Sequence, residues 1–200
     1  TSLPSSPALL ALAPSLTLLN LGGNLLSALP PFLADFAALE ILFFAGNRFE
    51  EVPDVLAKLP RLRVLSFKSC RLETLDIDAL PPTLEWLILT DNKLTSLPPD
   101  LGHRLPLLRK FLLAGNLLET LPDSFRNLTR LELLRISANR LSSLPDDLLA
   151  LPCLAWLAAA GNPCTSNSPP AAAGGGAAKP GEMEEGSVRV IPEGELDGTG

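Results

Sequence analysis

One leucine-spaced pattern recurs along the sequence at nearly constant intervals, and this periodicity limits the folds that the chain can adopt. The pattern L-x-x-L-x-L-x-x-N-x-L-x-x-L-P recurs seven times, and a clear copy runs from Leu84 through Asn92 to Pro98. The asparagine position is filled in turn by Asn24, Asn47, Cys70, Asn92, Asn116, Asn139 and Asn162. Consecutive copies are therefore 22 to 24 residues apart. Such regular spacing predicts an array of similar units that stack on one another.

The residue types within each copy predict its local structure. The L-x-L centre alternates with a period of two, which indicates a short strand with inward leucines and outward intervening residues. After the asparagine position, Leu-Pro leads into apolar residues spaced by three, such as Leu56, Leu59 and Leu62, which favours a helical or 3₁₀ turn. One unit cannot bury its own apolar face, so neighbouring units must cover it. The sequence thus predicts an α/β solenoid with one parallel sheet.

The repeated asparagine is a polar residue inside each unit, so its amide needs hydrogen-bond partners. We expect it to bond to backbone groups of its own and adjacent coils and to form a structural ladder along the array. Cys70 occupies this position in the third copy. Its thiol is a weaker donor of suitable size, and we assign it the same structural role.

The spacing of these residues resembles that of the leucine-rich-repeat family, roughly over residues 1–164. The resemblance implies a right-handed horseshoe with a parallel concave β-sheet and short helical or 3₁₀ turns on the convex side. Residues 16–164 would hold seven repeats. Residues 1–15 would be either a remnant of an earlier repeat or an N-terminal cap, since Thr1-Ser2-Leu3-Pro4 is identical to residues 95–98.

The sequence after the repeats has a different composition. Residues 165–187 are rich in Ser, Pro, Ala, Gly and Glu, which predicts a flexible linker. Residues 188–191 alternate weakly, and residues 188–200 are interpreted as the possible start of a following domain.

Outward residues of the predicted strands lie six, four and two positions before each ladder residue, and they should tile the concave face. This face is unusually apolar, and exposed apolar patches usually mark interaction sites. Aromatic residues with nearby Arg or Lys also resemble interface hot spots. The predicted partner-binding residues are Phe43, Lys68, Trp86, Ile88, Lys110, Leu112, Arg135 and Trp156. Coverage of the face by flanking repeats, by the C-terminal segment or by a neighbouring copy is the alternative.

The sequence argues against several other functions. It has a single histidine, His103, so no catalytic residues, metal site or cofactor are predicted. Residues 1–164 carry 14 basic and 16 acidic residues and residues 165–200 carry 2 and 6, so neither part has the basic excess that binds nucleic acid. No stretch of 18 apolar residues indicates a membrane span. Three cysteines are too few and odd in number for a disulfide framework, which favours a cytoplasmic location.

Several phrases resemble a narrower group, namely the arrays ahead of the catalytic domain in some plant, algal and bacterial leucine-rich-repeat protein kinases. They include residues 81–93, residues 133–139 and the end of the array at Asn162-Pro163-Cys164. This resemblance implies a protein-binding module that docks substrates or regulates a kinase domain outside the chain. The chain itself contains no glycine-rich nucleotide loop, H-R-D or D-F-G motif. The alternative is a free-standing scaffold or adaptor, such as a signalling or immune-type sensor.

Overall fold

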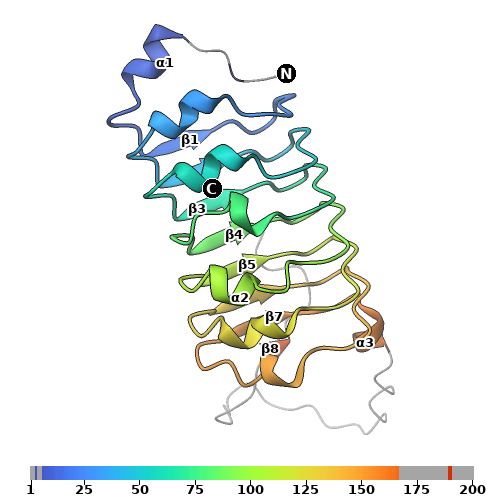
Figure 1. The fold of residues 1–200 in the computed structure, drawn as a ribbon. Helices are drawn as coiled ribbons and strands as arrows, with labels where there is room; N and C mark the ends of the chain where they lie inside the picture. The colour runs from blue at the N-terminus through green and yellow to red at the C-terminus, as the bar shows by residue number, and fades with distance from the viewer. Residues whose placement is uncertain (1–2, 4–5, 167–188, 191–200) are drawn as a thin grey trace, which may run out of the picture.

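The structure is a computed structural model that describes residue 3, residues 6–166 and residues 189–190. Eight short parallel strands stack in sequence order into one open sheet (Figure 1). They are β1 (Leu18–Asn20), β2 (Ile41–Phe43), β3 (Val64–Ser66), β4 (Trp86–Ile88), β5 (Lys110–Leu112), β6 (Leu133–Arg135), β7 (Trp156–Ala158) and β8 (Arg189–Val190). Each of the first seven overlaps the L-x-L centre of one copy and begins one residue before it.

The strands pair in the same register throughout the repeats, so equivalent positions lie side by side. Leu65 pairs with Leu42 on one side and with Leu87 on the other. In β2 to β7 the middle residue points inward and is buried, whereas its two neighbours point to the opposite face. In β1 the middle residue, Leu19, is half-buried. A shift of one residue would place the leucines in solvent, so their burial fixes the register.

Short helical segments return the chain on the other side of each coil. They are η1 (Pro31–Asp35), η2 (Asp54–Lys58), η3 (Ile77–Ala79), α2 (Leu101–Arg104), η4 (Asp123–Asn127) and η5 (Asp146–Leu148). Proline stands at the start of most of them, where its fixed φ favours the turn. The third repeat has no such proline, and the Asp76 side chain caps η3 instead by accepting a hydrogen bond from the Asp78 N–H.

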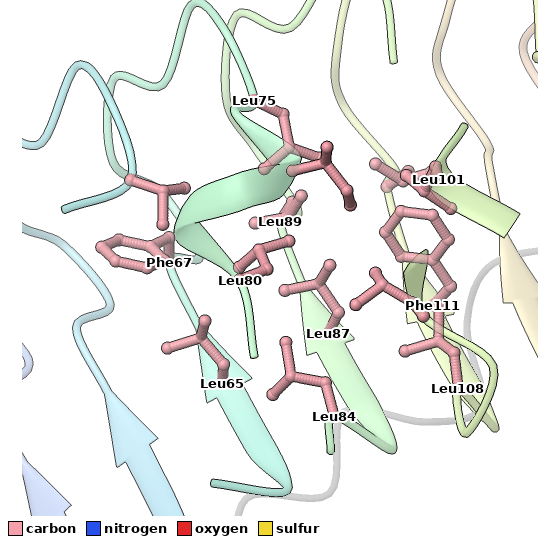
Figure 2. Packing of buried hydrophobic residues seen from close by; sticks show 14 of the residues in the cluster. Leu65, Phe67, Leu75, Leu80, Leu84, Leu87, Leu89, Leu101, Leu108 and Phe111 are labelled. Atoms are coloured by element: carbon pink, nitrogen blue, oxygen red, sulfur yellow. The ribbon is translucent and has the colours of Figure 1, made fainter. Parts of the chain in front are cut away.

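Leucines and phenylalanines from successive coils fill the space between the sheet and the helical segments (Figure 2). Leu65, Leu87 and Leu89 are fully buried there. Phe44, Phe49 and Phe67 form one aromatic cluster, with ring centroids 4.9 to 5.2 Å apart. Each fully buried Leu or Phe contributes roughly 1.5–3 kcal/mol, so the interior between coils is the main source of stability.

The sheet, its register and the short helical turns confirm the predicted solenoid. Before β1, α1 (Pro7–Ala11) is capped by Ser6, whose side chain accepts a hydrogen bond from the Leu9 N–H. The division into residues 1–15, a repeat array and later segments stays a prediction. α3 (Pro163–Ser166) follows the seventh repeat, and the remainder of the predicted linker, residues 167–187, lies outside the described residues. Within residues 188–200, the described part is β8, which pairs with β7.

Candidate functional site

The face of the sheet opposite the helical segments, here called the concave face, is built from three rows of equivalent residues. The strand register aligns the first two rows, which are the first and third residues of β1 to β7. The third row follows two residues later and runs from Gly22 through Lys68 and Ala114 to Ala160. Because inward leucines alternate with these residues, the repeat itself presents them on this face.

Five predicted binding residues come together at the middle of the concave face, and we call them the central patch: Trp86, Ile88, Lys110, Leu112 and Arg135. Trp86 pairs with Lys110, and Ile88 with Leu112, across β4 and β5. Leu112 also pairs with Arg135 of β6. The Lys110 Nζ lies 3.7 Å from the centroid of the Trp86 ring, which is a cation–π contact. Trp86 is 36% exposed.

The other three predicted binding residues lie away from the central patch. Phe43 is half-buried on β2, where it pairs with Ser66 of β3. Trp156 lies on β7 and is 42% exposed. Lys68 is exposed but lies beyond the end of β3, near the border of the face.

The ladder residues join each coil to the one before it. The Asn116 amide donates to the Leu113 carbonyl of its own coil and to the Leu89 carbonyl of the preceding coil, both at 2.9 Å. Its side-chain oxygen accepts a hydrogen bond from the Leu94 N–H. The same three contacts recur at Asn47, Asn92, Asn139 and Asn162.

Two ladder positions differ from this pattern. Asn24 is exposed and donates to the Leu21 and Gly22 carbonyls of its own coil; among the residues that the structure describes, it makes no bond to a preceding coil. Cys70 donates through its thiol to the Phe44 carbonyl of the preceding coil, at 3.3 Å. Burial raises the pKa of the Cys70 thiol, while nearby backbone hydrogen bonds offset part of that effect, so the thiol form is favoured.

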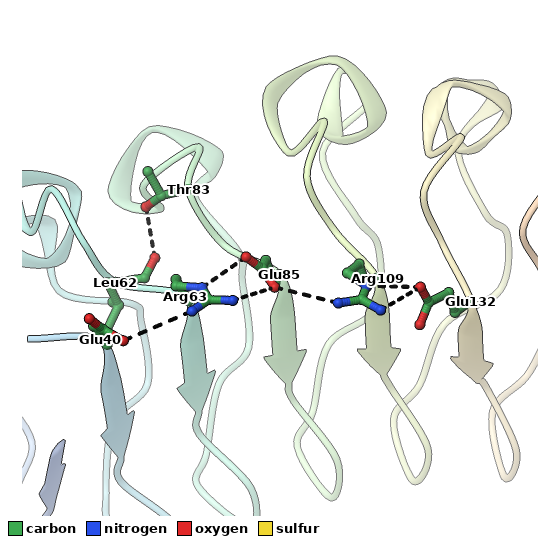
Figure 3. Close-up of polar contacts among 7 residues, drawn as sticks. All are labelled: Glu40, Leu62, Arg63, Thr83, Glu85, Arg109 and Glu132. Atoms are coloured by element: carbon green, nitrogen blue, oxygen red, sulfur yellow. Dashed lines mark hydrogen bonds and ion pairs between the residues drawn. The ribbon is translucent and has the colours of Figure 1, made fainter. Parts of the chain in front are cut away.

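A row of alternating charges borders the concave face, and the sequence reasoning missed it. Glu40, Arg63, Glu85, Arg109 and Glu132 each lie seven positions before a ladder residue and face one another across adjacent coils (Figure 3). The closest N–O distances between successive members are 4.0, 2.8, 3.9 and 2.7 Å. The alternation of sign at the repeat spacing was the signal that could have revealed this row.

The charged row shifts the titration of its central carboxylate. A hydrogen bond from Arg63 is the main cause that lowers the pKa of Glu85 below its ordinary value of 4.5, with further attraction from Arg63, Arg109 and Arg130. Partial desolvation opposes this shift. Glu85 therefore stays ionised and paired at neutral pH.

Other kinds of site find little support in the part of the chain that the structure describes. No group of three His, Cys, Asp or Glu side chains there is placed to hold a metal ion. The Nε2 atom of His103, the single histidine of the sequence, lies 3.1 Å from the Asn127 side-chain nitrogen. Among the same residues, no helix has the length and apolar character needed to cross a membrane.

Comparisons with known proteins agree with this architecture. A family model described as leucine rich repeat matches residues 60–118 and 82–141. This match, the sequence repeat and the stacked parallel sheet agree with a solenoid of the leucine-rich-repeat type. A comparison with curated proteins found no match.

Solved structures share the fold over most of the chain. A leucine-rich-repeat protein of Leptospira interrogans is 30% identical over 74% of this chain, with a TM-score of 0.70. A second match is a chain in an octameric complex of Latrophilin 3, Unc5D and FLRT2, of which FLRT2 is described by its leucine-rich repeats. This chain is 23% identical over 71% of the present chain, with a TM-score of 0.64. The present chain spans 38% and 46% of these two chains, respectively.

Proposed function

We propose that this chain is a protein-binding module that contacts its partner through the concave face. The observation that carries the proposal is the central patch, where large apolar side chains and two cations lie on an open sheet. The interior leucines supply the stability of the fold, so the residues on this face are not needed to fill a core.

The composition of the patch favours a protein partner. Trp and Arg are enriched among residues that dominate protein–protein interfaces, particularly where apolar neighbours exclude water around them. Trp86 offers a broad apolar ring, and Lys110 is already held against it. The side chains therefore lose little conformational freedom when a partner binds.

The structural neighbour that contains FLRT2 is part of a complex with other proteins. That fact concerns the neighbour, and it supports the proposal only by showing that this fold can take part in protein assemblies.

Replacement of Phe43 and Trp86 together by serine tests the proposal. A partner recovered with the wild-type chain as bait should bind the double variant at least tenfold more weakly, because the aromatic contacts on the face are lost. Isothermal titration calorimetry would measure the affinity, and circular dichroism would verify that the variant is folded.

The matched control is Leu149→Ser, which removes another large apolar side chain, 58% exposed beside η5 and off the concave face. It should leave partner affinity unchanged. Equal affinity of the wild type and the folded Phe43/Trp86 variant would exclude the concave face as the binding surface.

A narrower role is also part of the proposal: docking or regulation of a protein kinase domain outside these residues, in the cytoplasm. It is supported by the resemblance of residues 81–93 and 133–139 to arrays that precede kinase domains, and by the sparse, odd number of cysteines. The coding sequence after Gly200 tests it. A glycine-rich loop followed by a strand lysine would support this role, whereas an early stop codon would favour a free-standing scaffold or adaptor.

A further inference from the structure

The last strand of the repeats, β7, has one edge that no further repeat covers in the part of the chain that the structure describes. On its other edge, the Trp156 N–H donates to the Glu132 carbonyl of the preceding coil, at 3.0 Å. Backbone N–H groups along a strand point alternately to its two edges, so the Leu157 N–H points away from β6. In β6 the equivalent edge is covered by β7, where Leu134 pairs with Leu157. At β7 this edge needs another partner.

β8 supplies this partner, although it does not belong to the repeats. It lies beside β7 at the end of the sheet (Figure 1), where Arg189 pairs with Trp156 and Val190 with Leu157. Trp156 thus pairs with Leu133, 23 positions before it, and with Arg189, 33 positions after it. The chain therefore returns from beyond the repeats to close the sheet.

The same end of the array has a second cap, α3. The Cys164 N–H donates to the Leu141 carbonyl of the preceding coil, at 2.9 Å. The Thr165 hydroxyl donates to the Asn162 carbonyl, also at 2.9 Å. α3 therefore covers the turn that follows the last ladder position and leaves the sheet edge to β8. Terminal units that shield the last core are required for the solubility of repeat arrays.

β8 is a weaker cap than a repeat strand would be. Two of its residues are in the sheet, against three in each strand from β1 to β7. Fewer backbone hydrogen bonds hold it, and each contributes only modestly because water competes for the same groups. Covalent attachment through residues 167–188 keeps β8 near β7, and for a flexible connection this corresponds to an effective concentration on the order of millimolar. β8 can therefore detach while the repeats stay folded.

An uncovered β7 would be well suited to pair with another strand. An edge strand presents unpaired N–H and C=O groups, and charged residues or proline usually prevent their pairing with another chain. Residues 154–160 contain no charged residue and no proline. Trp156, 42% exposed on the same strand, offers an additional apolar contact.

A second copy of the chain is the partner that fits this edge, because every copy presents the same uncharged strand. A two-fold axis would place β7 antiparallel to the β7 of the second copy and would satisfy both edges. We propose that β8 is a detachable cap, and that β7 pairs with the β7 of a second copy when β8 leaves. This self-association is separate from partner binding at the central patch.

Replacement of Arg189 and Val190 by proline in the full chain tests this proposal, because proline removes the N–H groups that β8 can donate to β7. In hydrogen–deuterium exchange, at a concentration that keeps the chain monomeric, the Leu157 amide should exchange about tenfold faster than in the wild type. In sedimentation velocity at higher concentration, the variant should form dimers with a Kd about tenfold below that of the wild type. A peptide with the sequence of residues 186–192, in millimolar excess, should restore the monomer.

The matched control, Ala177→Pro/Ala178→Pro, also places two prolines in the C-terminal segment but leaves β8 intact. It should exchange and sediment like the wild type. A peptide of residues 186–192 with proline at positions 189 and 190 should not suppress the association. Circular dichroism would verify that the variants are folded, and Val190→Pro alone would replace the double variant if that variant unfolds.

Each contrary result has a distinct meaning. Unchanged exchange of the Leu157 amide would show that β8 does not protect this edge, and it would overturn the proposal. A variant that exchanges rapidly but stays monomeric would overturn the pairing of two copies. So would association that the 186–192 peptide does not suppress, because the contact would then lie elsewhere on the chain. None of these outcomes depends on the central patch, so they leave the proposed function untouched.

Discussion

The residue before each ladder position adopts a backbone conformation that most side chains avoid. Glycine occupies it at Gly23, Gly46, Gly115 and Gly161, whereas Ser69, Asp91 and Ala138 have positive φ values between 52° and 56°. A left-handed conformation costs a residue with a Cβ atom about 1–2 kcal/mol. The side chain of Asp91 accepts a hydrogen bond from the Ser69 hydroxyl, at 3.3 Å, but Ala138 has no polar group to offset the strain.

Replacement of Ala138 by glycine should therefore stabilise the protein by about 1 kcal/mol, because the strain relieved exceeds the entropy lost when glycine is ordered. Urea denaturation followed by circular dichroism would measure the change. Ala57→Gly is the control: this exposed alanine lies in η2 and has no positive φ, so the change should destabilise by roughly 0.5–1 kcal/mol. Equal effects of the two substitutions would refute the assignment of strain to Ala138.

At the scale of the elements, the ladder amides join adjacent coils through shared carbonyls. The Leu113 carbonyl accepts from Asn116 and also from Asn139 of the next coil. The Leu89 carbonyl is shared in the same way by Asn92 and Asn116. Loss of one amide therefore leaves each carbonyl with a second partner but deprives the Leu94 N–H of the bond that it donates to Asn116.

Asn116→Ala should destabilise the protein by about 2–4 kcal/mol, since one buried N–H is left unpaired and two further hydrogen bonds are lost. Asn24→Ala removes the same side chain from an exposed position, where it bonds to its own coil, and it should cost less than about 1 kcal/mol. Chemical denaturation of both variants would provide the comparison. A similar loss of stability in the two variants would show that the hydrogen bonds between coils contribute little to the free energy of unfolding.

The charged row also acts between elements, because its members come from successive coils. Glu85→Gln should lower stability at pH 7 by less than about 1 kcal/mol, since the partners are largely exposed. The folded pKa of Glu85 lies below 4.5, so its contribution is present above the unfolded pKa and disappears as the pH falls through the folded value.

Denaturation curves at pH 7 and at pH 3 would test this titration. The difference between the wild type and Glu85→Gln should shrink at the lower pH. Glu73→Gln, which breaks the isolated and exposed pair with Lys93, should have a smaller effect at pH 7. A Glu85→Gln difference that is the same at both pH values would contradict the role of ionisation.

At the scale of the whole molecule, each coil gains its burial from its immediate neighbours. Stability in such an array is approximately a sum of local and nearest-neighbour contributions. Exposed large apolar side chains are therefore found at the start of the described array, as at Leu18 and Leu25 in the first repeat. In the middle, the exposure of Trp86 cannot be attributed to a missing neighbour, which is why it supports a binding role.

The sequence alone determined the repeat, the strand centres, the short helical returns and the inward leucines. An alternation of apolar residues with a period of two favours a strand, and apolar residues spaced by three favour a helical turn, so few other arrangements are possible. It also indicated which residues face outward. Only the tertiary structure decided the contacts between neighbouring coils, because the sequence of a single repeat carries no information on the distances between coils. These include the charged row from Glu40 to Glu132, the contact of Lys110 with Trp86 and the exposure of Asn24. Each depends on which coil lies alongside, and only the stacked molecule supplies that neighbour.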